Sequence, residues 1–250
     1  MKVAVHEHEK GGKELRVSVP WSMIEDDYDA VAGEYAKVPL KGFRPGKAPP
    51  AEIFARFGAG ITNGLLSAAG TRLCRAALKK AGLAAGSPVT IADAVLKRND
   101  VLEFTATFIE MPCFELPDYL HLDLQAQDVP GRIDEISLWL LHNTTIALPE
   151  YFVAKELLYT DAGTSSSGNA ARKEAEDRVK LMLILKKIAD RDGLEVSQQE
   201  ITERTRALAD EHGMSLESFN GLLAAGNGLG RLADSLLAEK VLAYLSDAAH

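Results

Sequence analysis

Residues 41–50 read Lys-Gly-Phe-Arg-Pro-Gly-Lys-Ala-Pro-Pro, with two glycines and three prolines in ten positions. Such a segment cannot continue a helix, because proline lacks the amide donor and glycine favours other backbone angles. The glycines permit a tight, protruding tip. The segment therefore predicts an exposed, shaped loop that carries Phe43 as an apolar side chain and Arg44 and Lys47 as charges beside it.

Two interpretations of this loop remain open. An aromatic side chain next to arginine is typical of an interface hot spot, and Arg and Lys both suit carboxylate or phosphate partners. Alternatively, Phe43 folds back into the core and the charges are merely solvated. The docking interpretation is favoured, since this combination of residues has no obvious use in a core.

The segments on either side predict a compact α+β domain that ends near Met111. Apolar residues alternate with polar ones over 15–19 and 101–109, which predicts two strands with one buried face each. Helices are expected over 23–35, 51–57 and 61–81, with a cap at Ser22 and a break at 58–60. The order strand, helix, loop, helices, strand is that of a compact α+β domain.

The rest of the chain predicts helices. Three prolines, Pro112, Pro117 and Pro130, mark an extended connector. Helices are then expected over 134–141, 149–159, 170–191, 197–212, 215–225 and 229–248, with a capping box at Ser197 and Glu200 and a flexible link at 163–168. We therefore divide the chain into an α+β domain (1–112), a connector (113–133) and an all-α domain (134–250).

Charge is unevenly distributed along the 250 residues, whose net charge is −8. Residues 37–98 contain eleven Lys and Arg but only two acids, Glu52 and Asp93, which makes this segment +9. A basic block within an acidic chain indicates an anionic partner, either nucleic acid or an acidic protein surface. The alternative is an ordinary solvated helix face.

Composition argues against several classes of protein. The 46% hydrophobic content is enough for a real core, while two cysteines without metal-ligand spacing argue against a disulfide scaffold or a thiolate metal site. No apolar run is long enough to cross a bilayer, and no export signal precedes the first strand. We expect a soluble cytoplasmic protein without membrane, metal or cofactor. His6 and His8 lack a third ligand, and no catalytic group stands out.

The stretch Gly42-Phe-Arg-Pro-Gly-Lys-Ala-Pro49 resembles the Gly-Phe-Arg-x-Gly-Lys-x-Pro signature of trigger factor, a bacterial ribosome-associated chaperone. The similarity extends to Ile53–Gly58, to the basic helix that follows, and to the end of the last strand at Ile109–Pro112. Lys180–Ala248 is similar to the family's helical chaperone domain. The eight-residue signature is highly specific, and the helical similarity is less so.

The resemblance implies an ATP-independent chaperone that docks beside the exit tunnel of the large ribosomal subunit, on protein and ribosomal RNA, and shields nascent or unfolded polypeptides. The docking residues would be Lys41, Gly42, Phe43, Arg44, Pro45, Gly46 and Lys47. Client binding is assigned to apolar residues of the helical domain, Leu181, Met182, Ile184, Leu185, Phe219, Leu222 and Leu223, for which ordinary helix packing is the alternative. The +9 block agrees with an RNA partner. Whether two copies form a homodimer away from the ribosome stays open.

The sequence also departs from the family. Full-length trigger factor has a peptidyl-prolyl isomerase domain between its first domain and most of its arms, whereas this chain passes from Pro112 through a short connector into helices. We therefore expect a short variant that is not an enzyme. Two other functions remain as alternatives, a general RNA-binding protein that uses residues 37–98 and a residual prolyl isomerase.

Overall fold

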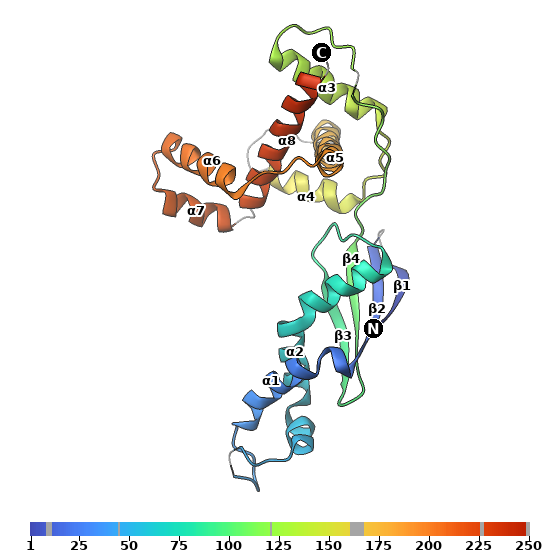
Figure 1. Ribbon diagram of the computed structural model, residues 1–250, viewed down its shortest axis with the longest axis vertical. Coiled ribbons are helices and arrows are strands. Elements are labelled where there is room, and N and C mark those ends of the chain that lie inside the picture. Colours follow the sequence, from blue (N-terminus) through green and yellow to red (C-terminus); the bar gives the residue numbers. More distant parts are fainter. Residues whose placement is uncertain (9–11, 45, 121, 161–167, 226–227, 249–250) are drawn as a thin grey trace. The chain divides into compact units, whose positions relative to one another are not determined.

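The computed structural model describes residues 1–8, 12–44, 46–120, 122–160, 168–225 and 228–248. The chain divides into two compact units, Met1–Pro112 and Cys113–His250, each with its own hydrophobic core. The first unit is α+β and the second is helical (Figure 1), which confirms the predicted fold class.

The first unit contains an antiparallel sheet with the strand order β1-β2-β4-β3. Its strands are β1 (Lys2–His8), β2 (Gly12–Pro20), β3 (Thr90–Lys97) and β4 (Val101–Ile109). The alternation predicted for β2 and β4 is confirmed, because their inward side chains are nearly fully buried: Leu15, Val17, Val19, Leu102, Phe104, Ala106 and Phe108. Strand β3 was not predicted, since a bulge between Ala92 and Val95 interrupts its alternation.

The long helix α2 (Pro50–Ala81) lies against one face of this sheet, and α1 (Glu25–Ala36) packs on α2 (Figure 1). The predicted break at 58–60 is wrong, because a single helix of 32 residues runs through it. Its glycines serve packing instead. A Cβ at Gly60 would lie 2.5 Å from the Tyr35 hydroxyl, and one at Gly64 would lie 2.8 Å from Val31 Cγ1. The missing side chains let the two helices approach closely.

The second unit consists of helices around one core. They are α3 (Val129–Asn143), α4 (Glu150–Thr160), α5 (Asn169–Asp192), α6 (Gln198–Glu211), α7 (Leu216–Ala225) and α8 (Gly228–Ala248). Helices α3, α5 and α8 supply most of the core, and α6 and α7 lie side by side as a hairpin (Figure 1). No helix in the described parts of the chain is both long and apolar enough to span a bilayer.

Helix boundaries follow local chemistry in several places. The capping box is confirmed, because the Glu200 amide donates to Ser197 Oγ while the Ser197 amide donates to the Glu200 carboxylate. The cap predicted at Ser22 is wrong, since α1 begins after Ile24 without a side-chain cap. Helix α3 begins at Val129 rather than at 134, because Pro130 suits a first helical turn. The link predicted at 163–168 lies outside the described residues except for Gly168.

The segment expected as a connector is extended but packs onto the helical core. Phe114, Tyr119 and Leu122 are buried there. The Tyr119 hydroxyl donates to the Asp192 carboxylate at 3.0 Å, and burial together with this bond raises the pKa of Tyr119 to about 12. Lys187 donates to the Phe114 carbonyl and lies 4.4 Å from the centre of its ring. These contacts fasten the segment to α5.

Candidate functional site

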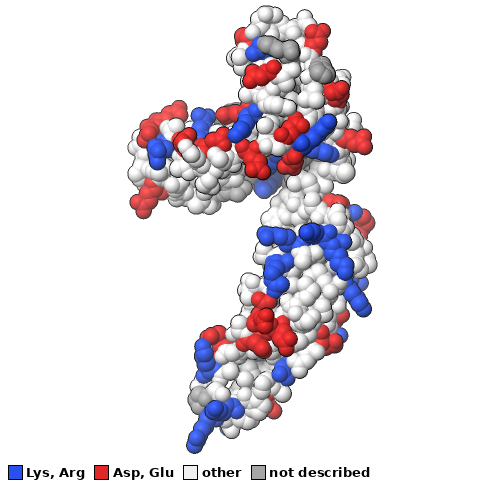
Figure 2. Space-filling model, in the orientation of Figure 1, with Lys and Arg blue, Asp and Glu red and all other residues white. Residues whose placement is uncertain are grey.

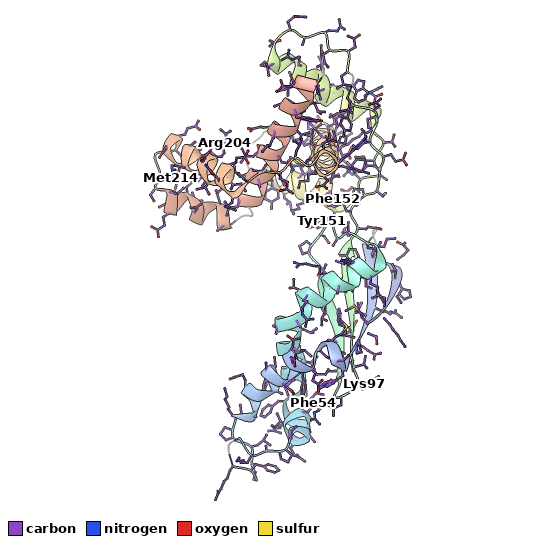
Figure 3. The ribbon with its side chains drawn as sticks, viewed as in Figure 1. Phe54, Lys97, Tyr151, Phe152, Arg204 and Met214 are labelled. Carbon is purple, nitrogen blue, oxygen red and sulfur yellow. The ribbon has the colours of Figure 1, made fainter. Side chains whose placement is uncertain are left out.

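The loop identified in the sequence joins α1 to α2 and rests on this packed helical pair. Leu40 and Ala48, near its two ends, pack against the core of the first unit. The Tyr35 ring at the end of α1 contacts the Phe57 ring on α2, with centroids 5.4 Å apart, and Phe54 lies one turn earlier on α2 (Figure 3). Both ends of the loop are therefore held by apolar packing against the core of the first unit.

Two short turns form the tip of the loop. The Phe43 amide donates to the Leu40 carbonyl at 3.0 Å, and the Lys47 amide donates to the Arg44 carbonyl at 2.9 Å. Pro45, which the sequence assigns to the docking residues, lies outside the described residues. The turns bring Phe43, Arg44 and Lys47 into one short, backbone-bonded segment.

Glycines give the tip its shape. Gly42 has a φ of 94° and Gly46 a φ of 75°, which are angles that residues with a side chain rarely adopt. The Gly46 amide donates to the Ala36 carbonyl at 3.1 Å, so the loop closes onto the end of α1. Apart from the chain neighbours, no atom of the described residues lies within 4 Å of a Cβ built at either glycine. The glycines are therefore required by backbone conformation and not by lack of space.

The side chains of the tip are available to a partner. Phe43 is 39% exposed, so it does not fold back into the core. Lys41, Arg44 and Lys47 are exposed, and among the described residues no carboxylate lies within 4 Å of their charged groups. An exposed aromatic with free bases can bind an apolar pocket and an anionic surface together.

The +9 block does not form one continuous surface. Three of its bases are paired within the unit: Lys37 with Glu34 at 2.7 Å, Arg72 with Asp27 at 2.5 Å, and Lys97 with Glu103 at 3.3 Å. Among the described residues, the bases without a carboxylate within 4 Å include those of the loop tip at one end of α2 and Arg75 and Lys79 near the other. A helix of 32 residues is about 48 Å long. Figure 2 shows basic side chains near both ends of this unit.

On α5, the structure corrects part of the client-binding prediction. Ile184 and Leu185 are 0% and 1% exposed and belong to the core, so they present no surface to a client. Leu181 and Met182 are half-buried. The nearly all-round apolar run serves packing, because α3, α4 and α8 all contact this helix.

The candidates on α7 lie at the surface to different degrees. Leu222 is 60% exposed, while Phe219 and Leu223 are half-buried. The Phe219 ring stacks on His212, the C-cap residue of α6, with centroids 6.0 Å apart. Met214 lies in the turn that joins the two helices (Figure 3). Helix α7 therefore presents one exposed leucine, Leu222, together with half-buried apolar side chains.

Two further exposed leucines were not predicted from the sequence. Leu138 on α3 is 68% exposed and Leu158 on α4 is 78% exposed. Near Leu158, Tyr159 is 39% exposed and lies 4.2 Å beneath the Arg231 guanidinium. At the start of α4, Tyr151 and Phe152 form an edge-to-face pair at 5.5 Å (Figure 3). The sequence of α4 did indicate exposed apolar residues, because this helix is apolar around most of its circumference and its neighbours cannot cover every side.

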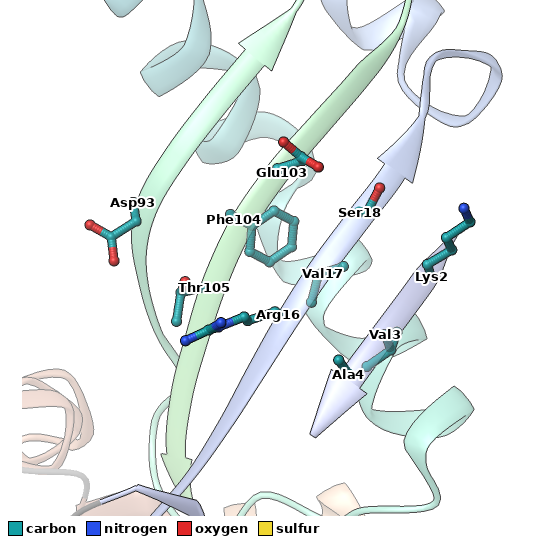
Figure 4. A pocket seen from close by; sticks show the side chains of 10 residues that line it. All are labelled: Lys2, Val3, Ala4, Arg16, Val17, Ser18, Asp93, Glu103, Phe104 and Thr105. Carbon is teal, nitrogen blue, oxygen red and sulfur yellow. The ribbon is translucent and has the colours of Figure 1, made fainter. Parts of the chain in front are cut away.

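The open face of the sheet has a shallow hollow of about 360 Å³ (Figure 4). Arg16, Ser18, Glu103 and Thr105 line it from β2 and β4, with Asp93 at the β3 side. The lining mixes both charges, so the hollow favours no ion of one sign. In the described part of the chain, no three His, Cys, Asp or Glu side chains are grouped to hold a metal ion.

A solved structure shares this fold along the full length of both chains, with a TM-score of 0.56 and 11% sequence identity. It comes from work on promiscuous substrate recognition in the folding and assembly activities of the trigger factor chaperone. The chain therefore shares the fold of that protein, an α+β unit followed by a helical unit.

Two family models extend this assignment to the sequence. The model for bacterial trigger factor protein matches residues 1–137, and the model for its C-terminus matches residues 147–247. The chain belongs to the bacterial trigger factor family.

Curated relatives agree with the family models. The chain is 31% identical over 130 residues to the trigger factor of Solibacter usitatus and 34% identical over 150 residues to that of Corynebacterium aurimucosum. These alignments cover 49% and 55% of this chain but only 31% and 32% of the relatives. The aligned part of the chain thus spans about a third of the length of these curated relatives.

Proposed function

We propose that this protein is an ATP-independent chaperone that docks on the ribosome near the exit tunnel and shields apolar segments of nascent or unfolded polypeptides. The loop from Lys41 to Lys47 provides the dock, and the helical unit provides the client surface. The protein would act in the cytoplasm, where ribosomes translate. Its partners are the large subunit and the emerging chain, and the activity requires no cofactor.

One observation carries the docking proposal. The loop tip presents a 39% exposed phenylalanine beside Arg44 and Lys47, and no described carboxylate lies within 4 Å of either base. An exposed aromatic side chain beside arginine is typical of an interface hot spot, and unpaired bases on a shaped loop suit phosphate or carboxylate. A ribosome offers both an apolar protein surface and RNA phosphates.

The client surface follows from the exposed leucines of the helical unit. Leu222, Leu138 and Leu158 are each at least 60% exposed and come from three helices. Scattered apolar contacts of this kind suit clients without a common sequence, because the hydrophobic effect is non-directional. Phe219 and Leu223 add half-buried apolar area beside Leu222. We propose these five residues in place of the buried pair on α5.

The chaperone would act without prolyl isomerisation. Only residues 138–146 separate the two family matches. An isomerase domain inserted there would need on the order of 100 residues. The helical unit therefore follows the first unit directly, and binding alone accounts for the proposed activity.

An aggregation assay tests this function and separates it from the alternatives. A chemically unfolded client is diluted into buffer with the purified chain, without ATP, and light scattering is recorded. The proposal predicts slower aggregation at near-equimolar chaperone and no turnover of a prolyl peptide. Unchanged aggregation together with tight binding of free RNA would support a general RNA-binding protein instead. Turnover of the prolyl peptide would restore the isomerase alternative.

A further inference from the structure

The solvent face of α2 carries a continuous row of polar side chains. Five exposed residues recur at four-residue intervals: Asn63, Ser67, Thr71, Arg75 and Lys79. Residues four apart are neighbours on a helix surface, so these side chains form one row about 24 Å long. We call them the donor row, because every member can donate a hydrogen bond.

The donor row lies in a segment without acids. After Glu52, the remaining residues of α2 include five bases and no Asp or Glu. No described residue of α2 is a large exposed hydrophobic. Protein interfaces normally depend on buried aromatic or aliphatic anchors, so this face is poorly suited to binding a folded protein. Arg, Lys, Ser, Thr and Asn are instead the side chains that usually contact phosphate and sugar.

The two bases of the donor row are free to bind an anion. Among the described residues, no carboxylate lies within 4 Å of Arg75 or Lys79, whereas Arg72 nearby is paired with Asp27. Lys80 donates to the Met1 carbonyl at 2.7 Å. The helix dipole explains bases in the last turn, where Lys79 and Lys80 lie. It does not explain Arg75 or the absence of acids over the preceding turns.

We propose that the donor row is a second nucleic-acid surface, which binds the phosphate backbone of A-form RNA independently of base sequence. It is separate from the docking loop, because Arg75 lies about 38 Å along α2 from Pro50. Two phosphate-binding surfaces, the loop before α2 and the donor row on α2, would let the first unit contact an RNA surface at two points. The inference does not depend on the docking loop.

Salt-dependent binding of a short fluorescein-labelled RNA duplex, followed by anisotropy, tests this surface. The chain with Arg75→Ala and Lys79→Ala is compared with wild type. Each lost phosphate contact lowers the slope of log affinity against log salt by about 1, so the double variant should lose about 2. Alanine is a good helix former and both positions are exposed, so the double variant should stay folded, with only a small fall in Tm from the lost dipole interaction of Lys79.

Two controls separate this surface from the docking loop. Lys97→Ala removes a base that is already paired with Glu103, and Arg44→Ala with Lys47→Ala removes the loop bases. For both variants, the slope of log duplex affinity against log salt should stay close to the wild-type slope. A wild-type slope in the Arg75/Lys79 variant would overturn the proposal. The proposal would also be overturned if Arg75→Ala with Lys79→Ala weakened the binding of an acidic peptide but left the binding of the RNA duplex unchanged.

Discussion

The Gly46 amide donates a hydrogen bond to the Ala36 carbonyl at 3.1 Å, which ties the loop tip to the last turn of α1. Gly46 makes this bond at a φ of 75°. A residue with a Cβ would be strained there by roughly 1–2 kcal/mol. The hydrogen bond that closes the loop onto α1 therefore favours glycine at position 46.

The Gly46→Ala variant tests that dependence. Because open space surrounds this position, only backbone strain should matter, and we expect a loss of about 1 kcal/mol in the free energy of unfolding. Ribosome affinity should fall with it, since the tip can relieve the strain only by moving. Urea unfolding and co-sedimentation measure the two effects. Wild-type values in both would show that the loop tolerates another conformation.

Close packing of α1 on α2 predicts opposite effects of alanine at two glycines. A Cβ at Gly64 would lie 2.8 Å from Val31 Cγ1, and such overpacking costs about 1–3 kcal/mol. Gly33 has nothing within 4 Å, so Gly33→Ala should gain about 0.5–1 kcal/mol from helix propensity. Thermal unfolding should show a lower Tm for Gly64→Ala and a higher one for Gly33→Ala. Equal shifts in the same direction would contradict the packing.

The capping box predicts a pH dependence of stability. Lys240 donates to the Glu200 carboxylate at 2.9 Å, and this bond together with the bonds from Ser197 lowers the pKa of Glu200 to about 2. The unfolded chain has a pKa of about 4.3 for this group and so binds the proton more readily. The stabilisation is present above about pH 4.3 and is lost as the pH falls towards 2.

Denaturant unfolding at several pH values measures this effect. Glu200→Gln should flatten the dependence of stability on pH between about 4.3 and 2, relative to wild type. Glu195→Gln, an exposed neighbour before the helix, is the matched control and should leave the curve unchanged. Identical curves for wild type and Glu200→Gln would contradict the role of this carboxylate.

Exposed leucines of the helical unit should matter for clients but not for stability. Leu222→Ser or Leu158→Ser removes a contact worth about 1.5 kcal/mol, which corresponds to roughly tenfold weaker binding of an unfolded client. Fluorescence anisotropy with a labelled, permanently unfolded client measures the affinity. Val95→Ser, which removes a 52% exposed side chain from the first unit, is the control. Equal losses in all three variants would exclude a specific client surface.

Substitutions at buried positions of α5 should lower stability but leave client affinity unchanged. Ile184→Ala should lower the free energy of unfolding by about 2–5 kcal/mol, because the side chain is 0% exposed within the core. Client affinity measured on the folded fraction should not change. A stable Ile184→Ala protein with weakened client binding would show that this residue reaches the surface after all.

Local patterns predicted much of the fold, and tertiary packing decided the rest. The alternation in β2 and β4 and the Ser197 capping box were visible in the sequence, because each depends on neighbours along the chain. The continuity of α2 through residues 58–60 was not visible, since Gly60 is explained by its close approach to Tyr35 on α1. Local sequence alone could not reveal those contacts.

The candidate site divides in the same way. The loop tip could be predicted because its glycines, aromatic and bases are adjacent in the sequence. Exposure on the helices could not, because Ile184 and Leu222 are both apolar helical residues and only the packing of neighbouring helices separates 0% from 60% exposure. The net charge of +9 likewise could not show that three of the bases in residues 37–98 form ion pairs within the first unit.

Ribosome co-sedimentation tests the central proposal most directly. Wild type, the Arg44→Ala/Lys47→Ala double variant and Lys97→Ala are titrated against purified ribosomes at one salt concentration, and the bound fractions give their affinities. We predict that the double variant binds roughly tenfold more weakly or worse, while Lys97→Ala, whose charge is already paired, binds like wild type. Wild-type binding by the double variant would contradict docking through this loop.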